Sequence, residues 1–143
     1  MRKILVAYDG SLLSRKAIES AKEQVSLLPD TEVHIVAVVE NTGPQTSGMI
    51  SRAMTDEVIE KAREQMDKIE KEFSSQGTSI VTEVLPQKGK ENPGKTISTY
   101  AKDNKVDLMI AGSRGLGNIK GVFLGSVSAE IVRHSECPVL IIK

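Results

Sequence analysis

The chain has 143 residues, in which 19 Lys and Arg balance 19 Asp and Glu, and it has a single cysteine. This length favours one domain, 1–143, with a core large enough to fold by itself. The zero net charge gives no basic excess for nucleic acid or an anionic membrane surface, and aromatic residues, at 3%, are too few for a base-stacking platform. One cysteine excludes an internal disulfide and a cysteine-based metal site, which favours a reducing compartment.

The start of the chain has only four clean apolar residues before Tyr8 and Asp9, which is too short for the core of a signal peptide. No apolar run approaches the length that spans a bilayer. We therefore expect a soluble cytoplasmic domain with neither nucleic acid nor a membrane among its partners.

Apolar runs alternate with segments of helical spacing along the first half of the chain. Residues 3–8 and 32–39 are short apolar runs that predict buried strands. Apolar positions three or four residues apart predict a helix over 13–28 and a longer, charge-laced helix over 54–73. Residues 41–51 are polar, with two glycines and a proline, and predict a mobile loop. Near-continuous apolar strands are expected in a parallel sheet that is covered on both faces.

The second half continues this alternation. Residues 79–85 alternate apolar and polar side chains, which predicts a strand with one more exposed face. Asn92 is placed to cap a short helix that has proline at its first position. Strands predicted over 106–111 and 138–142 then flank a glycine-rich stretch and a helix that starts at Ser126.

The order of these elements predicts an α/β fold with a single open, five-stranded parallel sheet and helices on both faces. Ligands of such sheets bind beyond the carboxyl ends of the strands, where the strand order reverses. The turn at 9–11 follows the first strand and Gly112 follows the fourth. If these two strands are neighbours, the two segments meet at the expected cleft.

The stretch 107–128 carries the strongest functional signal. Its strand leads through a glycine-rich loop into a helix, and five glycines fall within fourteen residues: Gly112, Gly115, Gly117, Gly121 and Gly125. Glycine lets the backbone approach a ligand, so that loop N–H groups and the helix N-terminus can face a phosphate. Ser126 adds a hydroxyl donor, and Arg114 and Lys120 add positive charge. The alternative is a flexible loop with an ordinary cap at Ser126.

Asp9 allows two interpretations. Asp-Gly is a favoured turn pair, so Asp9 can simply shape the bend. Its place at the expected cleft favours a contact with the ligand instead.

Neither His34 nor His134 has a neighbouring nucleophile, and no metal-ligand spacing is present, so we predict no catalytic residue.

Residues 89–96 match the P-loop pattern G-x-x-x-x-G-K-[ST] letter for letter. Pro93 removes one of the N–H groups that such a cradle uses. Asp107, a candidate magnesium ligand, precedes its strand and therefore lies at the wrong end of the sheet. These two features favour the stretch 107–128 over residues 89–96 as the phosphate site.

Three stretches together resemble the universal stress proteins, a family of small α/β domains that bind ATP or AMP. They are ILVAYDGS from Ile4, GSRG from Gly112 with a Gly-Ser pair after nine further residues, and HSECPVL from His134. The resemblance covers nearly the whole chain and implies an adenine nucleotide alpha hydrolase-like, doubly wound fold. The chain departs from the family pattern at 89–96, because the family usually connects this strand and helix more briefly.

The resemblance implies a role for each matching residue. Ala7 and Asp9 are expected beside the adenosine, with Asp9 near the ribose or a metal-linked phosphate, and Val38 is expected to meet adenine through its backbone. The ribose and phosphates are expected against Gly112, Ser113, Arg114 and Gly115. The phosphates are expected to be held by Gly125, Ser126, Val127 and Ser128, with magnesium bound through them.

The resemblance also implies a nucleotide-dependent regulatory module of the stress response and a homodimer formed through the apolar edge strand 138–142. It does not separate ATP from AMP. Two alternatives stay open: a slow ATPase or phosphotransfer enzyme that uses the same cleft, and a dimerising scaffold that binds no nucleotide.

Overall fold

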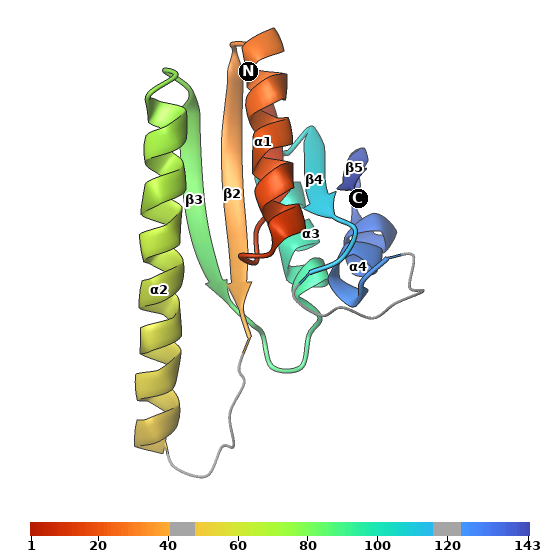
Figure 1. The fold of residues 1–143 in the computed structure, drawn as a ribbon. Helices are drawn as coiled ribbons and strands as arrows, with labels where there is room; N and C mark the ends of the chain where they lie inside the picture. Colours follow the sequence, from red (N-terminus) through yellow and green to blue (C-terminus); the bar gives the residue numbers. More distant parts are fainter. Residues whose placement is uncertain (41–47, 116–123) are drawn as a thin grey trace.

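The computed structural model describes residues 1–40, 48–115 and 124–143, the side chains of 48–55 excepted. Strands and helices alternate along the chain (Figure 1). In order, the elements are β1 (Arg2–Ala7), α1 (Leu12–Leu27), β2 (Thr31–Val39), α2 (Gly48–Ser74), β3 (Ser79–Pro86), α3 (Pro93–Asp103), β4 (Leu108–Gly112), α4 (Ser126–His134) and β5 (Val139–Ile142).

The five strands form one parallel sheet in the order β3-β2-β1-β4-β5. Strand β1 pairs with β2 on one side, where Ala7 lies opposite Val36, and with β4 on the other, where Val6 lies opposite Ile110. The strand order therefore reverses between β1 and β4. This confirms the predicted open, doubly wound sheet and places the carboxyl ends of β1 and β4 side by side.

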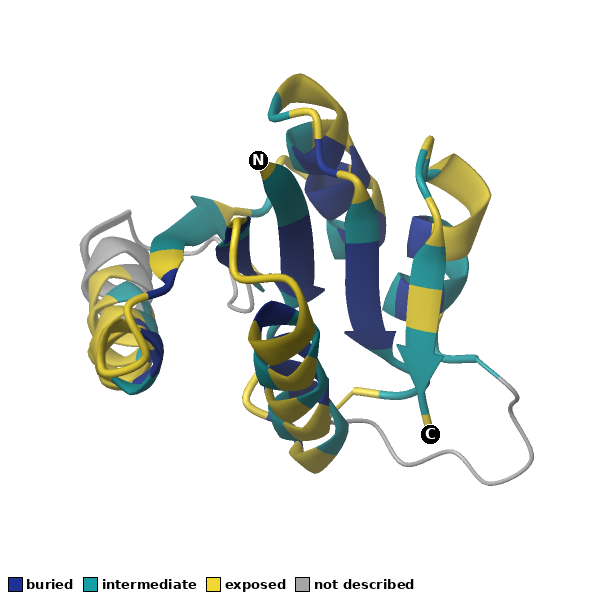
Figure 2. Ribbon diagram, turned by 90° about the horizontal axis from the view of Figure 1, so that it is seen from above, coloured by how far each residue is buried: buried dark blue, intermediate teal, exposed yellow. Residues whose placement is uncertain are grey.

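Helices cover both faces of the sheet (Figure 2). On one face, buried residues of α1 and α2 form a core with Ile4 and Val6 of β1. On the other face, buried residues of α3 and α4 form a second core with Leu5. Successive strand residues point to opposite faces, so a strand that is apolar throughout contributes to both cores.

Helix α2 begins earlier than the sequence analysis expects. Residues 48–51, expected as part of a loop, belong to the helix. Ile50 and Met54 continue the apolar spacing of Val58 toward the N-terminus, and this helical period outweighs the polar character of the stretch. The rest of the expected loop, 41–47, lies outside the described residues.

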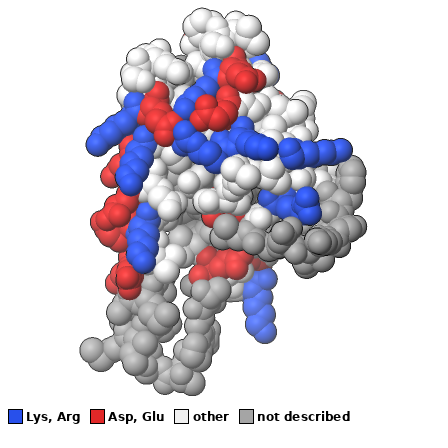
Figure 3. All heavy atoms as spheres, in the orientation of Figure 1, with Lys and Arg blue, Asp and Glu red and all other residues white. Residues whose placement is uncertain are grey.

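Charged side chains of both signs lie interspersed over α1 and α2 (Figure 3). This agrees with the amphipathic pattern of α2, which buries Met66, Ile69 and Phe73 and leaves its charged residues at the surface. Among the described residues, no helix combines the length and apolar character that a membrane crossing needs.

Candidate functional site

A cleft of about 720 Å³ opens at the carboxyl ends of the strands. Its walls come from the ends of β1, β2 and β4, from the starts of α3 and α4, and from one side of α2. Ten of the eleven residues that the sequence analysis singles out line it: Ala7, Asp9, Val38, Gly112, Arg114, Gly115, Gly125, Ser126, Val127 and Ser128. The cleft therefore lies where the strand order reverses.

Asp9 occupies the turn between β1 and α1. Gly10 has φ +82°, a conformation that glycine adopts without strain. The N–H of Ser11 donates to Asp9 Oδ1 at 2.9 Å, and the hydroxyl of Ser11 caps α1 by accepting from the N–H of Ser14 at 3.2 Å. Asp9 thus shapes the turn through one carboxylate oxygen while its exposed side chain also lines the cleft.

Gly115 brings the segment after β4 against this turn. A Cβ on Gly115 would collide with Asp9 Oδ2. Just before it, a Cβ on Gly112 would lie 2.8 Å from the Cβ of Leu13 on α1. Gly112 is needed for this close approach to α1, whereas a side chain at Gly115 would require the exposed Asp9 side chain to move. The end of β4 therefore lies directly beside Asp9.

Ser113 has a different position from its neighbours. It is 4% exposed and does not line the cleft. Its N–H donates to the carbonyl of Ile142 at 2.7 Å, and its own carbonyl accepts from the N–H of Gly125 at 2.7 Å and from Ser128 Oγ at 2.9 Å. Ser113 therefore joins the end of β4 to β5 and to the start of α4. The hydroxyl of Ser128 and the N–H of Gly125 are already used in this junction.

The first turn of α4 faces the cleft. Gly125 is its N-cap, at φ −69°, and no side chain in the described residues caps this helix end. Ser126 and Val127 follow at the first helical positions and line the cleft. Because backbone N–H groups at a helix N-terminus carry partial positive charge, this end suits an anion. Arg114 adds a full positive charge to the same wall.

An apolar wall lies next to this end of α4. Ala7, Val38 and Val127 pack against the core beneath α3 and α4 and also line the cleft. On the other side, Tyr8 lines the cleft and packs against the core beneath α1 and α2. Burial raises the pKa of Tyr8 above its ordinary value, and its hydroxyl is protonated at neutral pH. The cleft can therefore hold a flat, apolar group against this wall and a negatively charged group at the N-terminus of α4.

Helix α2 supplies a wall that the sequence analysis does not foresee. Val58, Lys61 and Gln65 line the cleft, and Gln65 Oε1 lies 3.8 Å from where a Cβ on Gly10 would be. These residues belong to an amphipathic helix whose charges indicate only a solvated face. No local signal marks them, because the side of α2 that meets the cleft depends on how the helix packs on the sheet.

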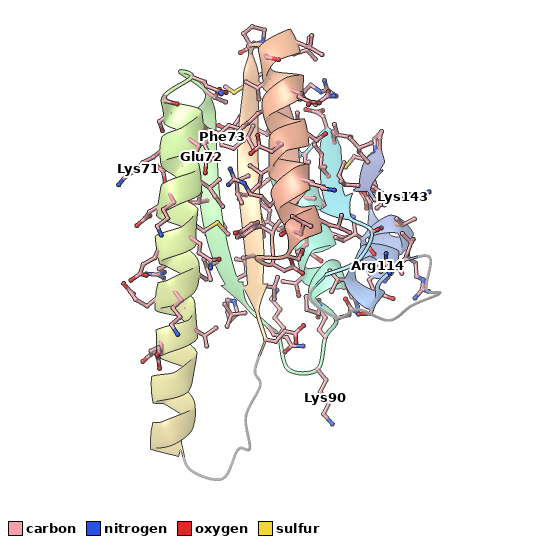
Figure 4. All side chains as sticks on the ribbon, in the orientation of Figure 1. Lys71, Glu72, Phe73, Lys90, Arg114 and Lys143 are labelled. Carbon is pink, nitrogen blue, oxygen red and sulfur yellow. The ribbon has the colours of Figure 1, made fainter. Side chains whose placement is uncertain are left out.

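The P-loop-like segment 89–96 caps a helix. Asn92 Oδ1 accepts from the N–H of Gly94 at 2.8 Å, which confirms the predicted cap of α3. Within this segment only Pro93 lines the cleft, and Lys90 projects away from the body of the molecule (Figure 4). Lys95 is exposed outside the cleft, so the lysine of the pattern does not reach the candidate phosphate site.

Some sequence predictions lie beyond what the structure describes. Gly117, Lys120 and Gly121 fall within 116–123, outside the described ranges. In those ranges, no group of three or more His, Cys, Asp or Glu could hold a metal ion.

Comparison with known proteins agrees with this architecture. The model of the universal stress protein family matches residues 1–143. The chain belongs to the universal stress protein family. Universal stress protein YxiE of Bacillus subtilis is 32% identical over 147 residues, which cover 99% of this chain and 98% of the relative.

Solved structures share the fold of this universal stress protein. Protein MJ0577 of Methanocaldococcus jannaschii has a TM-score of 0.87 at 27% identity, with 99% of this chain and 95% of that chain covered. A family member from Arabidopsis thaliana with AMP bound has a TM-score of 0.71 at 22% identity, with 100% and 92% covered. Similar folds at 23% identity have been solved in complex with cAMP and with dAMP.

Proposed function

We propose that this universal stress protein binds an adenine nucleotide, ATP or AMP, in the cleft at the ends of β1 and β4. The observation that carries the proposal is the N-terminus of α4, which no side chain of the described residues caps and which lines the same cleft as the Asp9–Gly115 contact and the apolar wall. Structures of similar fold that hold AMP, cAMP or dAMP support an adenine nucleotide as the ligand.

Each part of a nucleotide has matching chemistry in the cleft. The phosphates suit the N–H groups of Ser126 and Val127 and the positive charge of Arg114. The exposed carboxylate of Asp9 suits the ribose hydroxyls, because a carboxylate accepts hydrogen bonds. Adenine suits the apolar wall of Ala7 and Val38. Magnesium, when bound, would neutralise phosphate charge.

Nucleotide binding would make this protein a regulatory module of the cytoplasmic stress response. We further propose that it works as a homodimer formed through β5. This strand is at one edge of the sheet, and Leu140 in it is 37% exposed although it is apolar. Unpaired apolar strand edges favour association with a second chain.

Equilibrium titration with ATP, AMP and GTP, together with nucleotide analysis of freshly purified protein, tests the binding proposal. We expect wild-type protein to bind an adenine nucleotide and Asp9→Ala to bind it at least tenfold more weakly, a loss of about 1.4 kcal/mol. Asp30→Ala is the matched control, because Asp30 is an exposed turn aspartate before β2, at the opposite end of the sheet. Absence of adenine nucleotide binding by wild-type protein would exclude the proposed function.

A further inference from the structure

Gly94 is an unexpected residue for the first turn of α3. Glycine weakens helices relative to alanine, because it has more backbone freedom to lose on folding. Its φ is not positive, so the backbone conformation does not require glycine here. Gly94 is nevertheless buried. The reason for glycine at this position must therefore lie in what packs against it.

The first turn of α4 packs directly on Gly94. A Cβ at this position would collide with the carbonyl oxygen of Val127 and would lie 2.8 Å from the Cβ of Glu130. The collision with Val127 involves backbone, which cannot move aside as a flexible side chain can. Helix α4 can therefore hold its present position only while residue 94 has no side chain.

Gly94 is also held firmly from its own side. Its N–H donates to Asn92 Oδ1 at 2.8 Å, and its carbonyl accepts from Ser98 Oγ at 2.9 Å. Ser98 is itself buried at 5% exposure. Since the backbone N–H and the carbonyl of Gly94 both have hydrogen-bond partners, Gly94 is a rigid surface for α4 to pack against.

We infer that Gly94 is a positioning residue. Because it lacks a side chain, it lets the first turn of α4 take the position in which the N–H groups of Ser126 and Val127 lie at the cleft. The inference rests on the proposed nucleotide function. It gives the motif 89–96 a role different from that of a P-loop: its second glycine supports the phosphate-binding helix from behind, while Lys95 takes no part. A shift of α4 weakens contacts to phosphate more than contacts to the adenosine, because only Val127 of the apolar wall belongs to α4, while Ala7, Asp9 and Val38 belong to other elements.

The experiment compares Gly94→Ala with Lys95→Ala, using ATP, AMP and adenosine as probes with the full chain. We expect Gly94→Ala to weaken ATP binding at least tenfold while adenosine affinity stays within twofold of wild type. Lys95→Ala should leave both affinities within twofold. A merely structural role of Gly94 would lower ATP and adenosine affinity together, and that result would overturn the inference.

Other outcomes are equally decisive. ATP affinity of Gly94→Ala within twofold of wild type would overturn the inference and leave the proposed function standing. Selective loss of ATP binding in Lys95→Ala would favour a P-loop and also overturn it. Wild-type protein that binds no adenine nucleotide would overturn the proposed function, and this inference with it. Should Gly94→Ala not fold by circular dichroism, Asn92→Ala is measured in its place, because it frees the N–H of Gly94 and so loosens the surface on which α4 packs. Selective loss of ATP binding in Asn92→Ala would support the inference, and unchanged ATP affinity would overturn it.

Discussion

At the scale of single residues, His34 on β2 is a buried polar group outside the cleft with a hydrogen-bond partner at each ring nitrogen. It is 3% exposed, its Nδ1 lies 2.9 Å from the hydroxyl of Tyr100, and its Nε2 lies 2.8 Å from Glu32 Oε1. A carboxylate only accepts hydrogen bonds, so we assign the ring proton to Nε2 and let Nδ1 accept from Tyr100. Burial raises the pKa of Tyr100 to about 12, so its hydroxyl keeps the proton that this bond needs.

Replacing Tyr100 by Phe should destabilise the protein by about 1–3 kcal/mol, because the buried Nδ1 of His34 loses its donor. Nucleotide affinity should not change, since neither His34 nor Tyr100 lines the cleft. Urea unfolding measures the stability. Tyr8→Phe is the control, as the hydroxyl of Tyr8 has no hydrogen-bond partner in the part of the chain described. Equal stability of Tyr100→Phe and wild type would contradict the assigned network.

The site shows which residue-level roles follow from sequence. Gly115 and Asp9 are predictable as a pair, because each has a recognisable local signal and the strand order brings them together. The position of Ser113 is not predictable. Its sequence neighbours line the cleft, but Ser113 is buried and its backbone N–H and carbonyl are hydrogen-bonded to β5 and to the start of α4. Which way one residue of a loop points depends on partners far along the chain.

At the scale of elements, one carboxylate joins the two helices on the same face of the sheet. Glu72 of α2 accepts from Arg15 Nη1 at 2.9 Å and is also bound by Lys22, both residues of α1. Figure 4 shows Lys71 pointing away from the sheet, on the other side of α2 from Glu72 and Phe73. The hydrogen bond from Arg15 lowers the pKa of Glu72 to about 2.

Replacing Glu72 by Gln should cost about 1–2 kcal/mol of unfolding free energy at pH 7, a figure reduced for solvent screening because the side chain is 33% exposed. A carboxyl with a depressed folded-state pKa stabilises above its unfolded pKa. The difference between wild type and Glu72→Gln should therefore be full above about pH 4.5 and vanish as the pH falls to about 2. Denaturant unfolding across this pH range measures it.

Glu70→Gln is the matched control, since Glu70 is an exposed carboxylate on α2 with no ion pair in the part of the chain described. Its effect on stability should be within about 0.5 kcal/mol at every pH. A stability difference for Glu72→Gln that persists unchanged at pH 2 would show that the contact with Arg15 and Lys22 is not electrostatic in origin.

At the scale of the whole molecule, the edge strand β5 connects the cleft to the proposed dimer interface. The carbonyl of Ile142 accepts the N–H of Ser113 at 2.7 Å, and Ser113 in turn holds the start of α4. A second chain that pairs with β5 would therefore contact the strand that supports the wall proposed to bind phosphate.

Leu140→Glu should convert the proposed dimer to a monomer, because a charge would then be buried at the interface. Sedimentation equilibrium measures the mass in solution. Leu28→Glu at the carboxyl end of α1 is the matched control, since it changes an apolar residue of comparable exposure, 46% against 37%, that does not belong to the edge strand. A Leu140→Glu protein that remains dimeric would rule out this interface.

Much of the architecture follows from the sequence by itself. The alternation of apolar runs and helical spacing determines a parallel, doubly wound sheet, and the glycines at 112 and 115 with Asp9 mark the edge of the sheet where the cleft lies. These features are predictable because each depends on residues within a few positions along the chain, where period, turn chemistry and capping act.

Only the tertiary structure decided how these elements meet. It places Val58, Lys61 and Gln65 of α2 in the cleft. It also makes Gly94 a contact for α4, in place of the phosphate cradle that the letters of its motif suggest. The physical reason is that packing joins surfaces of elements distant in sequence, and the side of a helix that meets another element is set by the shape of both.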